Sequence, residues 1–291
     1  MISKQSGFSL IELMVAMVVG ILALAAIYGA FQSQQRAQTT QQMVVDMQQN
    51  ARAALAFMTR EIRMAGYQPT SHDGVDNDSA NGIDDPGESN VHGFVTARSD
   101  IIKFTLDLNA DGDDNDDNES ITYGFSNGTD ADGDGIADGG AAALGREHRT
   151  GAGFQVLAFD IEAIAFAYAF DDDNDGGLDT YGGAVDRGII WSYDSSGGGA
   201  LDRHLDTNVD GVIDHSDTPG GENLVGSGWA SAAISFNRIH AVQIWILART
   251  RNPVQGYQDT RTYVVGPRRV VCNDHFKRIL LNGVAYVRNP S

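Results

Sequence analysis

The sequence predicts an α+β fold in which one long N-terminal helix packs against an antiparallel β-sheet head with acidic loop insertions. Three observations point to this fold class. An apolar run near the N-terminus continues as a helical pattern that meets no proline before Pro69. Short segments with alternating apolar residues follow, which is typical of strands. Two blocks rich in Asp, Asn and Gly interrupt these segments and indicate loops.

The composition sets the first limits on function. The chain has 291 residues, of which 42% are hydrophobic, and this argues against a wholly disordered protein. Its formal net charge of -19 argues against a sequence-independent nucleic-acid binder, because such proteins need a basic face to displace counterions. The single cysteine, Cys272, allows no intramolecular disulfide.

The acidic residues are concentrated in two blocks. Residues 70–138 contain 18 acidic and two basic residues, and residues 171–222 contain 13 acidic and two basic residues. The remainder carries 8 acidic and 16 basic residues and is therefore mildly basic. Residues 238–291 are the most basic part of the chain. A basic C-terminal surface of this kind can bind an acidic partner, although a solvated face is the simpler interpretation.

The N-terminal apolar run covers residues 8–31, and Glu12 is its only charged residue. At about 1.5 Å per residue, a helix of this length can cross the roughly 30 Å of a bilayer's hydrocarbon. Lys4 precedes it and favours a cytoplasmic N-terminus. The alternative is an ordinary secretory signal peptide cleaved near Ala23–Ala25. Glu12 argues against that alternative, because a carboxylate at membrane depth costs roughly 2.5 to 3.5 kcal/mol and is kept when it has a partner or a task.

The residues Gly7-Phe8-Ser9-Leu10-Ile11-Glu12, followed by an apolar run, resemble the class III signal of type IV pilins and pseudopilins. The resemblance implies that residues 1–7 are a leader peptide, that a prepilin peptidase cleaves after Gly7, and that Phe8 is then methylated. It also implies that Glu12 pairs with the N-terminal amine of a neighbouring subunit in a filament. Two buried opposite charges on different chains cost less together than either does alone.

The helical pattern continues beyond Phe31 as an amphipathic helix, so we expect one helix from about Phe8 to Ala65, capped by Gly66. Its second half is expected to pack on the head, which leaves residues 8–66 as helix and residues 67–291 as the globular domain. The segment from Gln49 to Tyr67 also resembles the PilW family of minor pilins. The apolar positions that define the packing face are Val44, Met47, Ala51, Leu55, Met58 and Ile62.

Three acidic segments repeat the spacing D-x-[DN]-x-D-G-x-x-D. Calcium takes six to eight oxygen ligands at about 2.3 to 2.6 Å, and a tightly curled loop points alternate side chains inward. The spacing therefore predicts calcium sites, and a set of solvated acidic linkers is the alternative. The candidate ligands are Asp130, Asp132, Asp134 and Asp138; Asp171, Asp173, Asp175 and Asp179; and Asp206, Asn208, Asp210, Asp214 and Asp217.

Two less regular segments are weaker candidates for the same ion. Their candidate ligands are Asp76, Asp78, Asn81 and Asp84, and Asp107, Asn109 and Asp111. Without metal, the clustered carboxylates repel one another, and five divalent ions would bring the formal charge of -19 to about -9. Extracellular calcium modules work at calcium concentrations of roughly 10⁻⁴ to 10⁻³ M, so we expect the loops to become ordered only after export. The ions would then replace disulfides as the staples of the head.

Strands are expected from their content of β-branched and aromatic residues. In the stretch from Ala163 to Phe170, bulky residues alternate with alanines, which predicts one face against the long helix and one covered by loops. The segments FNRIHAVQIWILART and FKRILLNGVAYVRNP resemble the closing strands of PilW-type proteins. The predicted strands are Ile101–Leu106, Ser120–Phe125, Val156–Phe170, Ala241–Ala248, Thr262–Val265 and Val284–Val287.

The resemblance implies a minor pilin, a structural subunit that helps to initiate a type IV pilus or lies in its tip complex. Its partners would be other pilin subunits, through the N-terminal helix, and a prepilin peptidase. The prepilin would span the inner membrane once, with a cytoplasmic N-terminus, and the assembled subunit would extend from the periplasm into the extracellular pilus. Two alternatives stay open, a minor pseudopilin of a type II secretion system and a calcium-dependent adhesin at a pilus tip.

An enzyme is not expected. The seven histidines form no H-E-x-x-H pair or other zinc spacing. The chain also contains no G-x-S-x-G elbow and no P-loop motif. The paired carboxylates follow the register of the loops, which accounts for them without hydrolase chemistry.

Overall fold

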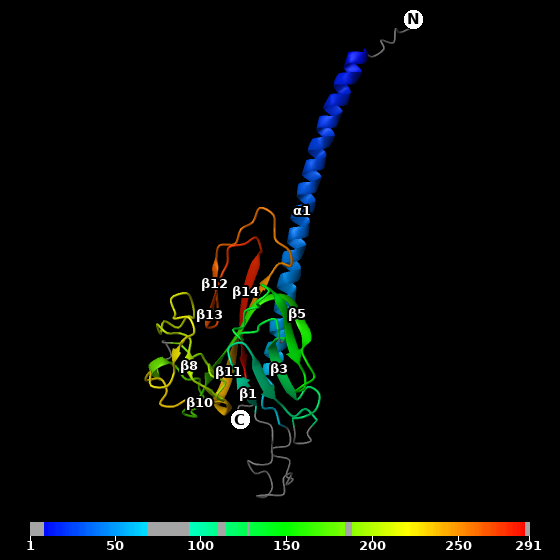
Figure 1. Ribbon diagram of the computed structural model, residues 1–291. Coiled ribbons are helices and arrows are strands. Elements are labelled where there is room, and N and C mark those ends of the chain that lie inside the picture. The colour runs from blue at the N-terminus through cyan, green and yellow to red at the C-terminus, as the bar shows by residue number, and fades with distance from the viewer. Residues whose placement is uncertain (1–8, 69–92, 110–113, 127, 184–187, 289–291) are drawn as a thin grey trace. The chain divides into compact units, whose positions relative to one another are not determined.

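The computed structural model describes residues 9–68, 93–109, 114–126, 128–183 and 188–288 (Figure 1). The chain divides into two compact units, Met1–Asp46 and Met47–Ser291. The first contains the N-terminal part of helix α1, and the second contains the rest of that helix and the sheet. The sequence-based expectation of one long helix and an antiparallel sheet is confirmed.

Helix α1 spans Leu10–Ile62 as one helix. It ends three residues before the predicted Ala65, and a series of turns follows it. Gly66 adopts a φ of 71°, a left-handed conformation that glycine tolerates without strain. Its N–H then donates a hydrogen bond of 2.9 Å to the carbonyl of Thr105, which ties the end of the helix to the sheet.

Among the described residues, the head contains one large antiparallel sheet and two short two-stranded sheets, β7–β10 and the hairpin β12–β13. The large sheet follows the order β1-β2-β3-β4-β5-β6-β8-β9, and β11 joins it by pairing with both β5 and β14. The strands are β1 (Phe94–Ala97), β2 (Ile102–Thr105), β3 (Ser120–Phe125), β4 (Ala142–Glu147), β5 (Gln155–Phe170), β6 (Ser192–Tyr193), β7 (Ala200–Leu201), β8 (Arg203–His204), β9 (Glu222–Asn223), β10 (Ile234–Ser235), β11 (Ile239–Arg249), β12 (Thr262–Val265), β13 (Arg268–Val271) and β14 (Arg278–Tyr286).

The helix covers the face of the sheet that carries the bulky residues of β5. Phe166 pairs with Ile244 on β11, which in turn pairs with Gly283 on β14, so these three residues share one face. A Cβ at Gly283 would lie 3.4 Å from the side chain of Leu55 on α1. The absence of a side chain at this position therefore lets the helix approach β14 closely.

The opposite face carries the alanines of β5 and is covered by the hairpin β12–β13. Ala165 pairs with Trp245 on β11. Gly266, in the turn of the hairpin, lies close to both residues, and a Cβ there would come within 2.6 Å of the Ala165 Cβ. The predicted alternation of bulky and small residues, with one face on the helix, is thus confirmed. The other face was expected to be covered by loops and is instead covered by this hairpin.

Polar contacts hold the C-terminal part of α1 to strands β3 and β4. The carboxylate of Glu61 accepts hydrogen bonds from Arg146 at 2.8 and 3.0 Å. It also accepts one from the hydroxyl of Tyr123. Because Arg146 and Glu61 are both largely removed from solvent, their pairing fixes the position of the last helical turns on the sheet.

Candidate functional site

Glu12 lies in the first turn of α1, whereas the other two predicted processing residues, Gly7 and Phe8, lie outside the described residues. Its carboxylate accepts a hydrogen bond from the Ser9 N–H at 2.8 Å, and the Ser9 hydroxyl oxygen accepts one from the Glu12 N–H at 3.2 Å. This reciprocal pair is a capping box, which the spacing Ser-x-x-Glu could have predicted. Glu12 is exposed in the single chain and open to a partner.

The apolar part of α1 presents its side chains outward. Each large apolar side chain from Leu10 to Phe31 is at least 55% exposed. By length and composition, the helix contains a window suited to crossing a membrane, with a mean hydropathy of 2.7, and that window is not buried in the described chain. Such a surface is suited to lipid or to apolar helices of other chains.

The three regular acidic segments share the same backbone conformation and the same hydrogen bonds, which together we call the frame. We call them loop A (Asp130–Asp138), loop B (Asp171–Asp179) and loop C (Asp206–Asp217). In each, the first Asp accepts hydrogen bonds from the N–H groups of the fifth and sixth residues. The donor-acceptor distances are 3.0 and 2.9 Å in loop A, 3.2 and 2.9 Å in loop B, and 3.2 and 2.8 Å in loop C.

The frame also depends on left-handed backbone conformations at the fourth and sixth residues. The sixth residue is always glycine, with φ of 81° at Gly135, 85° at Gly176 and 83° at Gly211. At the fourth position, loop C places Val209 at a φ of 60°, which is strained for a β-branched residue. The three loops thus reach the same conformation even where the local sequence disfavours it.

A second carboxylate closes each loop by accepting a hydrogen bond from the N–H of the second residue. In loops A and B the acceptors are the ninth residues, Asp138 and Asp179, each at 2.8 Å. In loop C it is the twelfth residue, Asp217, at 2.7 Å. The ninth residue of loop C, Asp214, instead accepts hydrogen bonds from the N–H and hydroxyl of Ser216. The twelfth-position acid of loop C therefore replaces the ninth-position acid of the other loops.

In loops A and B, the acids at the first, third and fifth positions lie close to one another. Asp130, Asp132 and Asp134 can place one carboxylate oxygen each within 4.8 Å of one another, and the first, third and fifth residues of loop B can do the same. Loop C has an amide at its third position, because Asn208 stands there. Oxygen atoms at this spacing match the ligand preference of a hard cation such as calcium.

Burial and mutual repulsion act on the acids of these loops. Burial raises the pKa of Asp130, and repulsion from Asp134 adds to the effect. Burial likewise raises the pKa of Asp206, with repulsion from Asp217. In loop B, burial opposes ionisation of Asp171, but hydrogen bonds from backbone N–H groups outweigh it and lower the pKa. The first acid of loops A and C is therefore held in an environment that disfavours its charge unless a cation is near.

A fourth segment, loop D (Asp194–Asp202), has the same frame without the same acids. Asp194 accepts hydrogen bonds from the fifth and sixth residues at 3.1 and 2.9 Å, and Asp202 accepts one from the second at 2.8 Å. Its third and fifth residues are Ser196 and Gly198. Reasoning from the ligand pattern missed this loop, although the spacing D-x-x-x-x-G-x-x-D is visible in the sequence.

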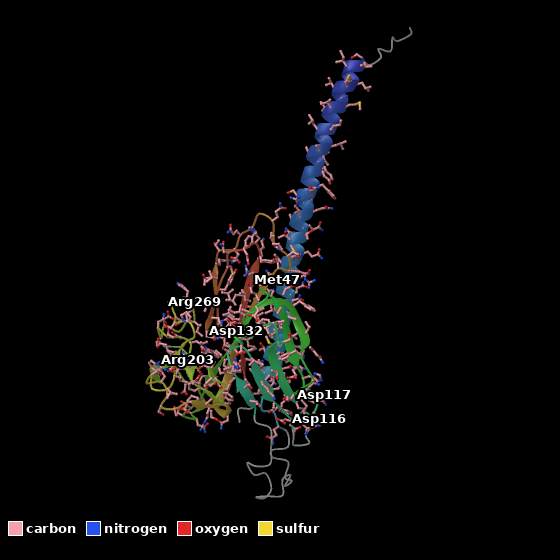
Figure 2. All side chains as sticks on the ribbon, viewed as in Figure 1. Met47, Asp116, Asp117, Asp132, Arg203 and Arg269 are labelled. Carbon is pink, nitrogen blue, oxygen red and sulfur yellow. The ribbon has the colours of Figure 1, made fainter. Side chains whose placement is uncertain are left out.

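The two less regular segments are only partly described. Asp107 is fully buried, whereas Asp111 and the group Asp76, Asp78, Asn81 and Asp84 lie outside the described residues. Glu119 accepts hydrogen bonds from the N–H of Leu108 at 2.9 Å and of Asp116 at 3.2 Å, so it closes this segment as Asp217 closes loop C. Figure 2 shows Asp132 of loop A apart from Asp116 and Asp117, so loop A does not share a site with that segment.

Comparisons with known proteins match the N-terminus. Residues 2–28 match the prokaryotic N-terminal methylation motif. No curated protein matches the chain significantly. Among solved structures, a type IV-like pilin from Thermus thermophilus is 13% identical, with 83% of this chain and 96% of that chain covered and a TM-score of 0.36. That score is too low to establish a common fold. The motif match confirms the prepilin-type signal, so the chain is pilin-like in its N-terminal segment.

Proposed function

We propose that the chain is a minor pilin, a structural subunit that takes part in the assembly of a type IV pilus. The observation that carries the proposal is the match of residues 2–28 to the N-terminal methylation motif. A prepilin peptidase cleaves after Gly7, and Phe8 becomes the methylated N-terminus of the mature subunit. The prepilin resides in the inner membrane, and the assembled subunit resides in the pilus.

The exposed apolar surface of α1 supports a filament role. Its side chains contact lipid before assembly and the helices of neighbouring subunits afterwards. Glu12 then pairs with the N-terminal amine of a neighbouring chain, which offsets the cost of placing a carboxylate among apolar side chains. Before that pairing, the capping box with Ser9 provides the Glu12 carboxylate with a hydrogen bond.

The head supports the narrower assignment to PilW-type minor pilins. The segments that resemble that family form the C-terminal part of α1 and the paired strands β11 and β14. The acidic loops lie between these segments as insertions. A minor pseudopilin of a type II secretion system is the alternative, since it carries the same class of signal. Neighbouring genes for pilus assembly would favour the first assignment, and neighbouring genes for secretion would favour the second.

Calcium is proposed as the ion that stabilises the head. Loop D forms the shared frame with Ser196 and Gly198 at the third and fifth positions, so the frame does not need acids there. Loops A and B nevertheless carry Asp at both positions, where the carboxylates repel one another. A divalent cation accounts for acids that the backbone conformation does not require.

Deleting the gene and scoring surface pili tests the proposed function. We expect fewer or no pili, restored by the wild-type gene and not by Glu12→Ala. Asp46→Ala, which removes an exposed carboxylate from the same helix outside the apolar run, serves as the matched control and restores piliation. Normal piliation in the deletion strain, together with a loss of protein secretion, would instead establish the pseudopilin alternative.

A further inference from the structure

An open pocket of about 370 Å³ lies where α1 ends beside the end of β14. Three of its six lining residues are arginines, in a chain whose formal net charge is -19. Arg60, Arg63 and Arg288 are all exposed. We call this site the arginine pocket, and it is lined by Ala56, Thr59, Arg60, Arg63, Met64 and Arg288.

The three arginines are not neutralised within the described chain. No described residue forms an ion pair with any of them, and the nearest acid in sequence, Glu61, is bound to Arg146 and Tyr123 instead. Arg60 lies over the ring of Phe57 at 5.2 Å, a contact that leaves its charge unpaired. Arginines near the C-terminal end of a helix interact favourably with the helix dipole. That interaction does not explain the position of Arg288, because Arg288 follows a strand.

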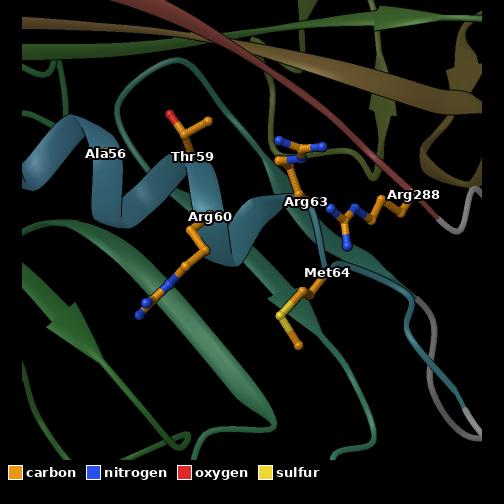
Figure 3. A pocket seen from close by; sticks show the side chains of 6 residues that line it. All are labelled: Ala56, Thr59, Arg60, Arg63, Met64 and Arg288. Atoms are coloured by element: carbon orange, nitrogen blue, oxygen red, sulfur yellow. The ribbon is translucent and has the colours of Figure 1, made fainter.

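The backbone fixes the two sides of the pocket relative to each other. The N–H of Arg288 donates a hydrogen bond of 3.1 Å to the carbonyl of Arg63. Figure 3 shows the side chains of Arg63 and Arg288 near each other, while Arg60 points to the other side of the helix end. The positive charges are therefore spread along a surface and do not converge on one point.

We propose that the arginine pocket binds an acidic segment, with several closely spaced carboxylates, on a neighbouring protein subunit. Spread guanidinium groups match several carboxylates in a row better than they match one compact phosphate. Ala56 and Met64 provide apolar surface for the methylene groups of such side chains. The acidic loops of this chain show that Asp clusters with exposed members, such as Asp132 and Asp173, occur on a subunit of this kind. The identity of the partner as a subunit rests on the proposed pilin function.

Binding of a fluorescent poly-aspartate peptide to the detergent-solubilised full chain, measured by anisotropy at constant free calcium, tests the proposal. We expect the double variant Arg63→Gln/Arg288→Gln to bind at least about tenfold more weakly than the wild type. Arg36→Gln/Arg52→Gln, which removes two exposed arginines from the same helix outside the pocket, is the control for net charge and changes binding less than about twofold. A poly-asparagine peptide does not bind.

Two results would overturn the proposal. One is equal peptide affinity of the wild type and the double variant, with both shown to be folded by circular dichroism. The other is preferential binding of inorganic phosphate or of phosphatidylglycerol vesicles, lost in the double variant, which would make the pocket a phosphate site. Because the assay requires no filament, it reports on the pocket even if the deletion strain shows that the chain is not a pilin.

Discussion

Arg278 connects three acidic side chains in the interior of the head. Its guanidinium lies 2.5 Å from the carboxylate of Glu162, 2.6 Å from that of Asp274 and 3.6 Å from that of Asp259, and its side chain is 1% exposed. These residues come from β14, from β5 and from the segments on either side of the hairpin β12–β13. In a chain with a single cysteine, this ion cluster links segments that a disulfide could otherwise have joined.

Replacing Arg278 by Met should destabilise the head by roughly 3 to 5 kcal/mol, because it leaves buried carboxylates without their partner. Urea unfolding followed by circular dichroism measures the loss. The matched control is Arg251→Met, which breaks a pair with Asp160 at 3.3 Å that involves a largely exposed arginine. We expect this control to cost less than about 1 kcal/mol. Equal losses in the two variants would contradict the role of the cluster.

The same cluster predicts a loss of stability in acid. Hydrogen bonds from Arg278 lower the pKa of Asp274. Burial opposes ionisation of Asp259, but hydrogen bonds from Arg261 and Tyr263 outweigh it and lower the pKa. A carboxyl whose pKa is lowered by folding stabilises the protein above its unfolded pKa of about 3.9, and this contribution disappears as the pH falls through the folded pKa.

Thermal melts between neutral pH and about pH 2.5 check this expectation. Asp274→Asn should lower the melting temperature near neutral pH and should make the decline below about pH 4 shallower than in the wild type. The comparison with the wild type separates the cluster from the acidic loops, which titrate in both proteins. Parallel curves for the two proteins would show that Asp274 contributes nothing to the acid transition.

At the scale of elements, regular hydrophobic patterns predicted the fold well. The helix, β3 and β12 were located closely, because their apolar or β-branched residues follow one period without interruption. Strand β4 has the sequence AALGRE, with no β-branched or aromatic residue, and was missed. Strand β14 begins six residues before the predicted Val284, because Asn282 and Gly283 interrupt the pattern. Pairing with β11 holds these residues in the strand despite their low propensity.

The candidate sites could be predicted only where the types of side chain in the sequence identify them. The Asp spacing located loops A, B and C, and all three share one frame. Loop D was missed because Ser and Gly replace the acids, although the same hydrogen bonds form. The arginine pocket could not be predicted, since Arg63 and Arg288 are far apart in sequence and are joined by one backbone hydrogen bond where the end of the helix meets the end of β14.

Calcium should raise the melting temperature of the head, and part of the increase should depend on loop A. At about ten times its Kd, a single site adds roughly 1.4 kcal/mol of stability. Asp132→Asn should reduce the increase. In chelator it should not lower the melting temperature, and should raise it slightly, because Asp132 takes no part in the hydrogen bonds of the frame and its neutralisation relieves repulsion with Asp130 and Asp134.

Asp202→Ala in loop D is the control for calcium binding. It removes the acceptor of the Ser195 N–H and should lower stability with or without calcium, while leaving the calcium-dependent increase unchanged. Differential scanning calorimetry with added calcium and with chelator measures both effects. Identical wild-type melting temperatures in the two conditions would contradict the calcium proposal.

At the scale of the whole molecule, two kinds of surface coexist in one chain. The N-terminal unit exposes apolar side chains, and the second unit has its own buried core with charged and polar loops. A membrane-anchored subunit that later joins a filament needs both, since its helix must leave lipid for other helices while its head stays in water. The N-terminal methylation motif is the feature on which the proposed route rests.

The mature N-terminus therefore tests the account most directly. The full chain is expressed with a prepilin peptidase, and its N-terminal peptide is identified by mass spectrometry. We expect the mature chain to begin at Phe8, with an N-methyl group on that residue. A chain that keeps Met1, or that begins after the small residues near Ala25, would contradict the central claim that this protein is processed as a prepilin.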